Sequence, residues 1–197
     1  MVGALYVATK AARKEQMTRR KLKRLALPAL VVMIAAAVAV PAFAQTAPRA
    51  TTLKAIGKAS FKANRYVKDG MHFNRDSVTI RRGGTLRLVD ETKAPHTFSL
   101  VKRSQLPRTM KQMENCFGKG PCDDLALAHG AVNPDTGEEQ DPTTPLVNVG
   151  AAGFNRPGDS VLIPPGGRTK VKITGSSDKY YLCAIHPWML GKVDVVG

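Results

Sequence analysis

One short motif near the C-terminus constrains this 197-residue chain most, because it places three potential metal-binding side chains on a single loop. The motif is Cys-x2-His-x2-Met and consists of Cys183, His186 and Met189. A second imidazole is available far upstream at His96. Two histidines and one cysteine in a trigonal plane, with a long axial methionine, form the ligand set of a blue-copper centre. The sequence therefore predicts a fold that brings these two distant segments together around one copper ion.

Most of the remaining sequence has the pattern of short strands separated by turns rich in glycine and proline. The expected strands cover residues 77–80, 85–90, 96–101, 159–163, 169–174, 179–183 and 191–196. Alternation with a period of two is typical of strands with one buried face. Because His96 shares its parity with Phe98 and Leu100, a regular strand directs all three side chains to the buried layer. We therefore expect an all-β sandwich.

A long insertion, residues 102–157, interrupts the strand pattern before the C-terminal strands. It is rich in Pro, Gly, Asp and Asn, and it predicts no more than single helical turns near residues 108–115 and 123–129. A loop of this length inside one domain is uncommon and is usually functional or mobile. Cys116 and Cys122 flank a Gly/Pro turn, so we predict a disulfide between them in an oxidising compartment.

Residues 1–44 have the features of a secretory signal peptide. A basic stretch precedes an apolar run over residues 25–40, and a small-x-small cleavage site ends at Ala44. A start at Met17 would give a leader of ordinary length, with paired arginines that loosely resemble a twin-arginine signal. The apolar run is shorter than the roughly 20 residues of a membrane span, and an uncleaved anchor is the alternative. We expect a periplasmic or secreted protein that begins near Gln45, with no membrane span after cleavage.

The mature chain is basic and has the length of one domain. Without residues 1–44 it keeps 22 basic and 14 acidic residues, a net charge of +8. Such a field attracts acidic proteins or anionic surfaces, although it also serves solubility alone. The sequence lacks RNA-binding, helix-turn-helix and zinc-finger patterns, so nucleic acid is not an expected partner. We expect residues 45–59 to be a loose segment and residues 60–197 to form a monomeric domain.

These features resemble the cupredoxin family, and most nearly its amicyanin-like members. The resemblance rests on His96 at the start of a strand, on the segment 180–189 and on the strand that closes the chain. It covers roughly residues 61–101 and 158–197, and it implies a Greek-key β-sandwich with one copper ion that alternates between Cu(I) and Cu(II). The implied ligands are His96, Cys183, His186 and the weakly bound axial Met189.

Two features depart from the family pattern. Thr97 follows the first histidine where relatives usually have asparagine, and 86 residues separate His96 from Cys183, more than in small members. The Thr97 hydroxyl is expected to replace only part of the hydrogen bonding that ties the two ligand segments together. His72, in an expected strand, and His129, in the insertion, are expected not to be ligands.

The resemblance implies a carrier of single electrons between redox partners rather than an enzyme. Copper oxidases and nitrite reductases need further histidine clusters, but the chain has four histidines, and it lacks the Cys-x3-Cys loop of the two-copper centre. The donor and acceptor are expected to be redox proteins with acidic surfaces, such as a cytochrome or an oxidoreductase. Family members expose the second histidine through an apolar patch, which Pro187, Trp188 and Leu190 would form here.

Two other functions are compatible with the same residues. The chain could bind copper for trafficking, storage or resistance, without a redox partner. Alternatively, the insertion could be an interaction arm carried by a cupredoxin scaffold. A blue colour that depends on Cys183 would favour electron transfer, whereas colourless binding of Cu(I) would favour trafficking. Deletion of residues 103–156 would test the interaction arm.

Overall fold

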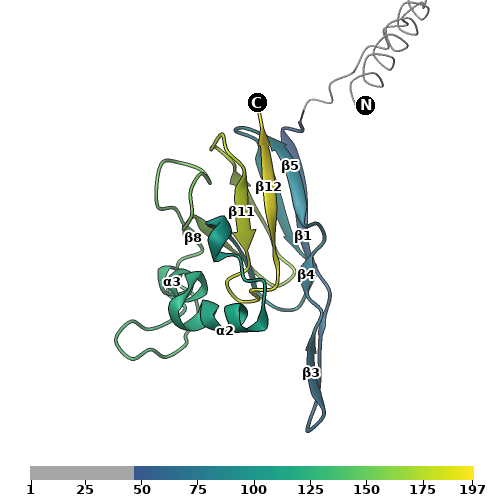
Figure 1. Cartoon of the computed structure of the whole chain (residues 1–197), viewed down its shortest axis with the longest axis vertical. Coiled ribbons are helices and arrows are strands. Elements are labelled where there is room, and N and C mark those ends of the chain that lie inside the picture. The colour runs from purple at the N-terminus through teal and green to yellow at the C-terminus, as the bar shows by residue number, and fades with distance from the viewer. Residues whose placement is uncertain (1–46) are drawn as a thin grey trace, which may run out of the picture. The chain divides into compact units, whose positions relative to one another are not determined.

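The computed structural model describes residues 47–197, in which two β-sheets face each other and two helices cover one outer side (Figure 1). The expected signal peptide lies outside the described residues. The strands are β1 (Ala50–Ile56), β2 (Ala59–Lys62), β3 (Tyr66–Asp69), β4 (His72–Phe73), β5 (Ser77–Arg81), β6 (Thr85–Asp90), β7 (His96–Val101), β8 (Leu146–Val147), β9 (Ser160–Ile163), β10 (Arg168–Lys172), β11 (Lys179–Leu182) and β12 (Leu190–Val196). The helices are the 3-10 helix η1 (Arg103–Gln105), α2 (Met110–Lys119) and α3 (Pro121–Ala128).

The strands form the all-β sandwich that the sequence predicted. One sheet has the order β10-β6-β1-β4, the other has the order β5-β12-β11-β7-β9-β8, and β2 with β3 forms a separate hairpin. Two neighbouring pairs are parallel, β1 with β6 and β5 with β12, and the other pairs are antiparallel. Because β7 and β11 are neighbours, the strand that begins at His96 runs beside the strand that ends just before Cys183.

The main apolar core lies between the two sheets, as strand alternation requires. Leu86 and Leu88 of β6 point inward and are fully buried, and Arg87 between them is exposed. Strand β7 differs, since all six of its residues are buried. Its outer face is covered by a second apolar cluster in which Val101 packs with residues of the insertion.

The structure corrects the expectation that residues 45–59 form a loose segment. Residues 50–56 are strand β1, which lies inside the four-stranded sheet and pairs in parallel with β6. Leu53 is fully buried opposite Leu88 of β6. The segment has only two large apolar residues, Leu53 and Ile56, among threonines, alanines and a lysine, so its strand character comes from pairing with β6 rather than from its own pattern.

The insertion, residues 102–157, is more ordered than its sequence predicted. It contains two helices longer than single turns, α2 and α3, and the predicted disulfide between Cys116 and Cys122 joins them. Both cysteines lie in the second apolar cluster, and Phe154 at the other end of the insertion lies in the main core. The insertion is therefore part of the folded core, and removal of residues 103–156 would remove core packing. Within residues 47–197, no helix is long and apolar enough to cross a membrane.

Candidate metal centre

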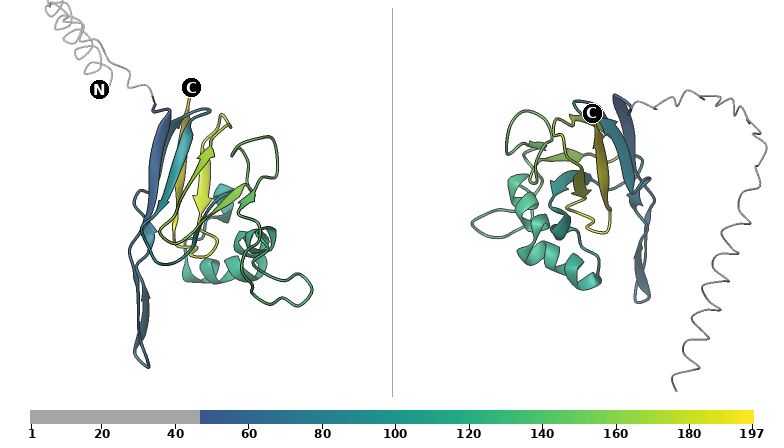
Figure 2. Two further views of the ribbon diagram at one scale, coloured as in Figure 1. Left: turned by 180° about the vertical axis from the view of Figure 1, so that it is seen from behind. Right: turned by 45° about the horizontal axis from the view of Figure 1, so that its top comes forward.

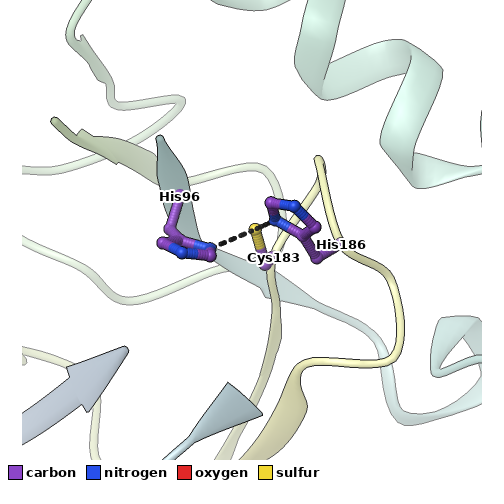
Figure 3. Close-up of side chains that lie close together, drawn as sticks. All are labelled: His96, Cys183 and His186. Atoms are coloured by element: carbon purple, nitrogen blue, oxygen red, sulfur yellow. Dashed lines mark hydrogen bonds between the residues drawn. The ribbon is translucent and has the colours of Figure 1, made fainter. Parts of the chain in front are cut away.

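Three of the predicted ligands, His96, Cys183 and His186, meet in one buried cluster, which Figure 3 shows in close-up. The nitrogen and sulfur atoms of His96, Cys183 and His186 all lie within 4.8 Å of one another. The Sγ of Cys183 is 3.8 Å from Nδ1 of His96 and 3.7 Å from Nδ1 of His186. The exposed fractions of the three residues are 0%, 0% and 7% in chain order, so water has little access to the donor atoms.

Sheet pairing and a closed loop hold these side chains in place. Leu182 of β11 pairs with Ser99 of β7, so Cys183 follows directly on a strand held against the strand of His96. The loop after Cys183 is closed by two backbone hydrogen bonds of 2.8 Å: Met189 N–H donates to the His186 carbonyl, and Cys183 N–H donates to the Met189 carbonyl. Met189 is itself buried, in the same apolar core cluster as Cys183. The local fold thus brings the four predicted ligand residues into one region.

Hydrogen bonds on the far side of His96 fix which of its nitrogens faces the cluster. Its Nε2 lies 2.9 Å from Oγ1 of Thr92, and that hydroxyl donates to the Ala94 carbonyl. The Thr92 oxygen therefore accepts from Nε2–H, which leaves Nδ1 of His96 without a proton and facing Cys183. His186 has a similar arrangement, with Nε2 located 3.7 Å from Oδ2 of Asp69. Both imidazoles thus direct Nδ1 toward the sulfur.

A buried carboxylate lies behind His96 and was not anticipated from the sequence. Oδ1 of Asp90 accepts a hydrogen bond from Thr92 N–H, at 2.6 Å. Oδ2 of Asp90 is 4.0 Å from Nε2 of His96, and it has no hydrogen-bond partner among residues 47–197. Asp90 ends strand β6, six residues before His96, so only the fold brings its carboxylate to this nitrogen. It places a negative charge beside the first candidate ligand.

The electrostatics of the cluster favour neutral side chains until a cation binds. Burial raises the pKa of the Cys183 thiol. Hydrogen bonds to its sulfur oppose this rise in pKa, and the bond from Thr97 N–H, at 3.3 Å, does so most. Burial lowers the pKa of both histidines, and for His96 the neighbouring His186 lowers it further, against the attraction of Asp90. Neutral imidazoles keep a lone pair for a metal ion, and a bound cation would stabilise the thiolate.

Thr97 links the two ligand segments, as its position after His96 suggested. Its Oγ1 accepts a hydrogen bond from Ala184 N–H at 2.7 Å and another from the Ser99 hydroxyl at 2.9 Å. The Ser99 oxygen lies 2.6 Å from that of Ser160, which lies 2.7 Å from Nε2 of His129. A buried chain of hydrogen bonds therefore runs from the metal-site loop to the insertion.

The two other histidines, His72 and His129, lie outside the cluster. His129 is buried, and its Nδ1 lies 2.6 Å from the Thr144 carbonyl, while its Nε2 contacts the hydroxyl of Ser160. His72 is exposed, and its Nδ1 lies 2.9 Å from the Gly70 carbonyl. Both imidazoles are therefore engaged away from Cys183.

The structure corrects the expected apolar docking patch around the second histidine. Trp188 is 39% exposed, and its indole ring lies edge-on to the imidazole of His186, with ring centroids 5.3 Å apart. Pro187, by contrast, is buried within the tight turn that closes at Met189. Leu190 is the first residue of strand β12, and its side chain is half-buried against the second apolar cluster. Of the three predicted docking residues, only Trp188 is exposed.

The donor set and its spacing fit a soft or borderline transition metal. Bonds of about 2.1 Å to imidazole nitrogen and about 2.3 Å to thiolate sulfur, at angles between tetrahedral and trigonal, separate nitrogen from sulfur by about 3.6–3.8 Å. The observed distances of 3.8 and 3.7 Å agree with this spacing. Thiolate and imidazole suit copper or zinc, whereas calcium and magnesium require oxygen ligands.

Solved structures similar to this chain include several cupredoxins. A purple cupredoxin from Nitrosopumilus maritimus is 14% identical, with 74% of this chain and 98% of that chain covered and a TM-score of 0.39. Amicyanin from Paracoccus versutus is 16% identical (75% and 81% covered, TM-score 0.35), and auracyanin from Roseiflexus castenholzii is 14% identical (77% and 99% covered, TM-score 0.37). No protein-family model and no curated protein matches the chain. With identities and TM-scores this low, the functional assignment rests on the site itself.

Proposed function

We propose that this chain is an exported type 1 copper protein that carries single electrons between redox partners. One observation carries the proposal: in a buried cluster, Nδ1 of His96 and Nδ1 of His186 face Sγ of Cys183 at 3.8 and 3.7 Å. This is the equatorial donor set of a blue-copper site. When bound, a copper ion supplies one-electron chemistry by alternating between Cu(I) and Cu(II).

The four proposed ligands are His96, Cys183, His186 and Met189. The thiolate and the two imidazoles are the strong donors, and the thioether of Met189 is proposed as the weak fourth donor. Met189 supports copper over zinc, because thioether sulfur is a soft ligand that favours copper. Its burial beside Cys183 in the core, and its backbone bonds to Cys183 and His186, are consistent with this role.

The surroundings of the cluster support electron transfer in two ways. The donor residues are held by sheet pairing, by the closed loop and by hydrogen bonds from Thr92 and Thr97, so the site is preorganised. In addition, His186 lies next to the exposed Trp188, which places one proposed ligand close to the surface. An electron can leave through this edge while water stays away from the copper ligands.

A role in copper trafficking or storage has less support from this geometry. Delivery of copper to another protein requires that a second set of ligands reaches the ion. Here the exposed fractions of His96, Cys183 and His186 are 7% or less. A deeply buried site favours retention of the metal. Export is proposed from the leader and from the disulfide between Cys116 and Cys122, which fits an oxidising compartment such as the periplasm.

The test is to load the mature protein, from Gln45 onward, with Cu(II) and to record its visible and electron paramagnetic resonance spectra. We expect one copper per chain and an intense blue band that disappears in Cys183→Ser. His72→Ala is the control, because His72 is exposed and outside the cluster, and it should keep the band. Colourless protein that binds Cu(I) would instead support trafficking, and the absence of copper binding would refute both functions.

A further inference from the structure

The hairpin formed by β2 and β3 projects away from the sandwich (Figure 1). It belongs to neither large sheet, and residues 57–68 are all exposed. Seen from behind, it again extends beyond the end of the sandwich where the loop before β12 turns (Figure 2). A two-stranded hairpin without a packed face is marginal in water. The apolar side chains on this hairpin therefore add little to the stability of the fold, and their exposed surface is open to contact with another molecule.

The register of the hairpin separates an apolar face from a basic one. Phe61 pairs with Val67, so these two side chains lie on the same face, and they are 73% and 77% exposed. The adjacent pairs carry lysines on the opposite face, with Lys62 opposite Tyr66 and Lys68 opposite Ser60. Residues 58–68 contain four basic residues and no acidic one.

The base of the hairpin contacts the proposed metal centre. Asp69 lies two residues after Val67, on the same face of β3, and its Oδ2 is 3.7 Å from Nε2 of His186. Just after the hairpin, the Met71 carbonyl accepts a hydrogen bond of 3.1 Å from the indole N–H of Trp188. The apolar face of the hairpin is thus continuous with the edge at which His186 approaches the surface.

Two glycines at the base allow the two chain segments to approach closely. Gly57 has a φ of +103°, and a Cβ at this position would lie 2.3 Å from the carbonyl oxygen of Gly70. The amide of Gly70 donates to the Lys58 carbonyl at 3.1 Å. A side chain at residue 57 would push the segments apart. The direction of the hairpin relative to the metal centre is therefore set by this glycine contact.

We propose that residues 59–69, the docking hairpin, bind an acidic redox protein and place it against the His186 edge. This inference rests on the proposed function and names the partner surface for it. Phe61 and Val67 supply apolar contact, and the basic face attracts the partner over a longer distance. A second copy of this chain is disfavoured as the occupant, because it carries the same basic hairpin and a net charge of +8 after residue 44. A membrane surface is the alternative occupant, which the vesicle measurement below tests.

The experiment measures electron transfer from the copper-loaded mature protein to two probes by stopped-flow absorption of the blue band. The probes are an acidic and a basic c-type cytochrome of similar reduction potential. The test variants are Phe61→Ser with Val67→Ser, and Lys62→Glu with Lys68→Glu. Their matched controls replace exposed residues elsewhere, Leu146→Ser on β8 and Lys170→Glu with Lys172→Glu on β10.

We expect both hairpin variants to slow transfer to the acidic cytochrome by about tenfold or more at low ionic strength, and both controls to stay within about twofold. With the basic cytochrome, the Lys→Glu hairpin variant should react faster. Equal rates for hairpin and control variants would overturn the inference. Two other results would also overturn it, if the hairpin variants left the transfer rates unchanged. One is loss of binding to phosphatidylglycerol vesicles in these variants, and the other is loss of a dimer that the unmodified protein forms. A retained blue band in each variant separates these outcomes from failure of the copper assignment itself.

Discussion

The hydroxyl oxygen of Thr97 accepts a hydrogen bond of 2.7 Å from the backbone N–H of Ala184, and so joins the strand of His96 to the loop of Cys183. Both residues are buried, so water cannot replace this bond. The same threonine donates its own backbone N–H to Sγ of Cys183, at 3.3 Å. One residue thus controls how the two halves of the proposed site are aligned.

The variant Thr97→Val should therefore destabilise the protein, because it keeps the shape of the side chain but leaves Ala184 N–H buried without an acceptor. We expect the free energy of unfolding of the metal-free protein to fall by about 1–3 kcal/mol, measured by urea denaturation. Thr97→Ser retains the hydroxyl and should lose much less. Equal stabilities for the two variants would show that the hydroxyl bond is unimportant. In the copper-loaded protein, Thr97→Val should also shift the blue band.

A second prediction concerns the charge of Asp90, whose Oδ2 lies 4.0 Å from Nε2 of His96. A fixed negative charge stabilises the more positive, oxidised state of a copper site. Asp90→Asn should therefore raise the reduction potential, measured by voltammetry. If the variant weakens binding of Cu(II) relative to Cu(I) by tenfold, the potential rises by about 59 mV. Glu91→Gln is the control, because Glu91 is half-exposed and pairs with Lys54 instead of His96. It should shift the reduction potential less than Asp90→Asn does, and equal shifts would contradict the prediction.

The sequence singled out the three residues that meet in the buried cluster, because the spacing of Cys183 and His186 reflects chemistry that few residue types can provide. Cys183 and His186 lie three residues apart on one loop, and His96 begins a strand in which all six residues are buried. The predicted strands with regular alternation, such as β5 and β6, are also present in the structure. These features are local, and local patterns suffice to identify them.

Features that depend on contacts between distant segments could not be predicted in this way. Strand β1 gains its order from β6, and the β2–β3 hairpin has no buried face, so neither has a clear alternating pattern. The carboxylate of Asp90 reaches His96 only in the folded chain. Burial of Pro187 likewise depends on the turn that Met189 closes.

A third prediction follows from His129, a buried histidine distant from the proposed ligands. Burial lowers its pKa below the usual 6.5, against a hydrogen bond to the Thr144 carbonyl that raises it. The unfolded chain therefore binds a proton at higher pH than the folded chain does. The stabilisation that comes from burying a neutral His129 is fully present above pH 6.5. It is lost as the pH falls from 6.5 toward the lower pKa that His129 has in the folded protein.

In that acidic window, His129 alone should contribute a slope of up to about 1.4 kcal/mol per pH unit to the free energy of unfolding. His129→Gln removes this contribution, so its stability should depend less steeply on pH than that of the unmodified protein. Both proteins are compared without metal, because His96 and His186 then contribute equally to each measurement. Parallel curves for His129→Gln and the unmodified protein would contradict the prediction.

The last prediction concerns the disulfide between Cys116 and Cys122, which are separated by six residues. Closing so short a loop restricts the unfolded chain only moderately, so the double variant Cys116→Ala, Cys122→Ala should lose about 2 kcal/mol of stability. Both sulfurs lie in the second apolar cluster beside Leu182 and Ala184, which flank Cys183 along the chain. Removal of the disulfide should nevertheless leave the blue band intact, because sheet pairing and the closed loop hold the donor atoms of the metal centre. Thermal unfolding and the visible spectrum test the two parts separately, and loss of the band would show that the insertion determines the geometry of the metal centre.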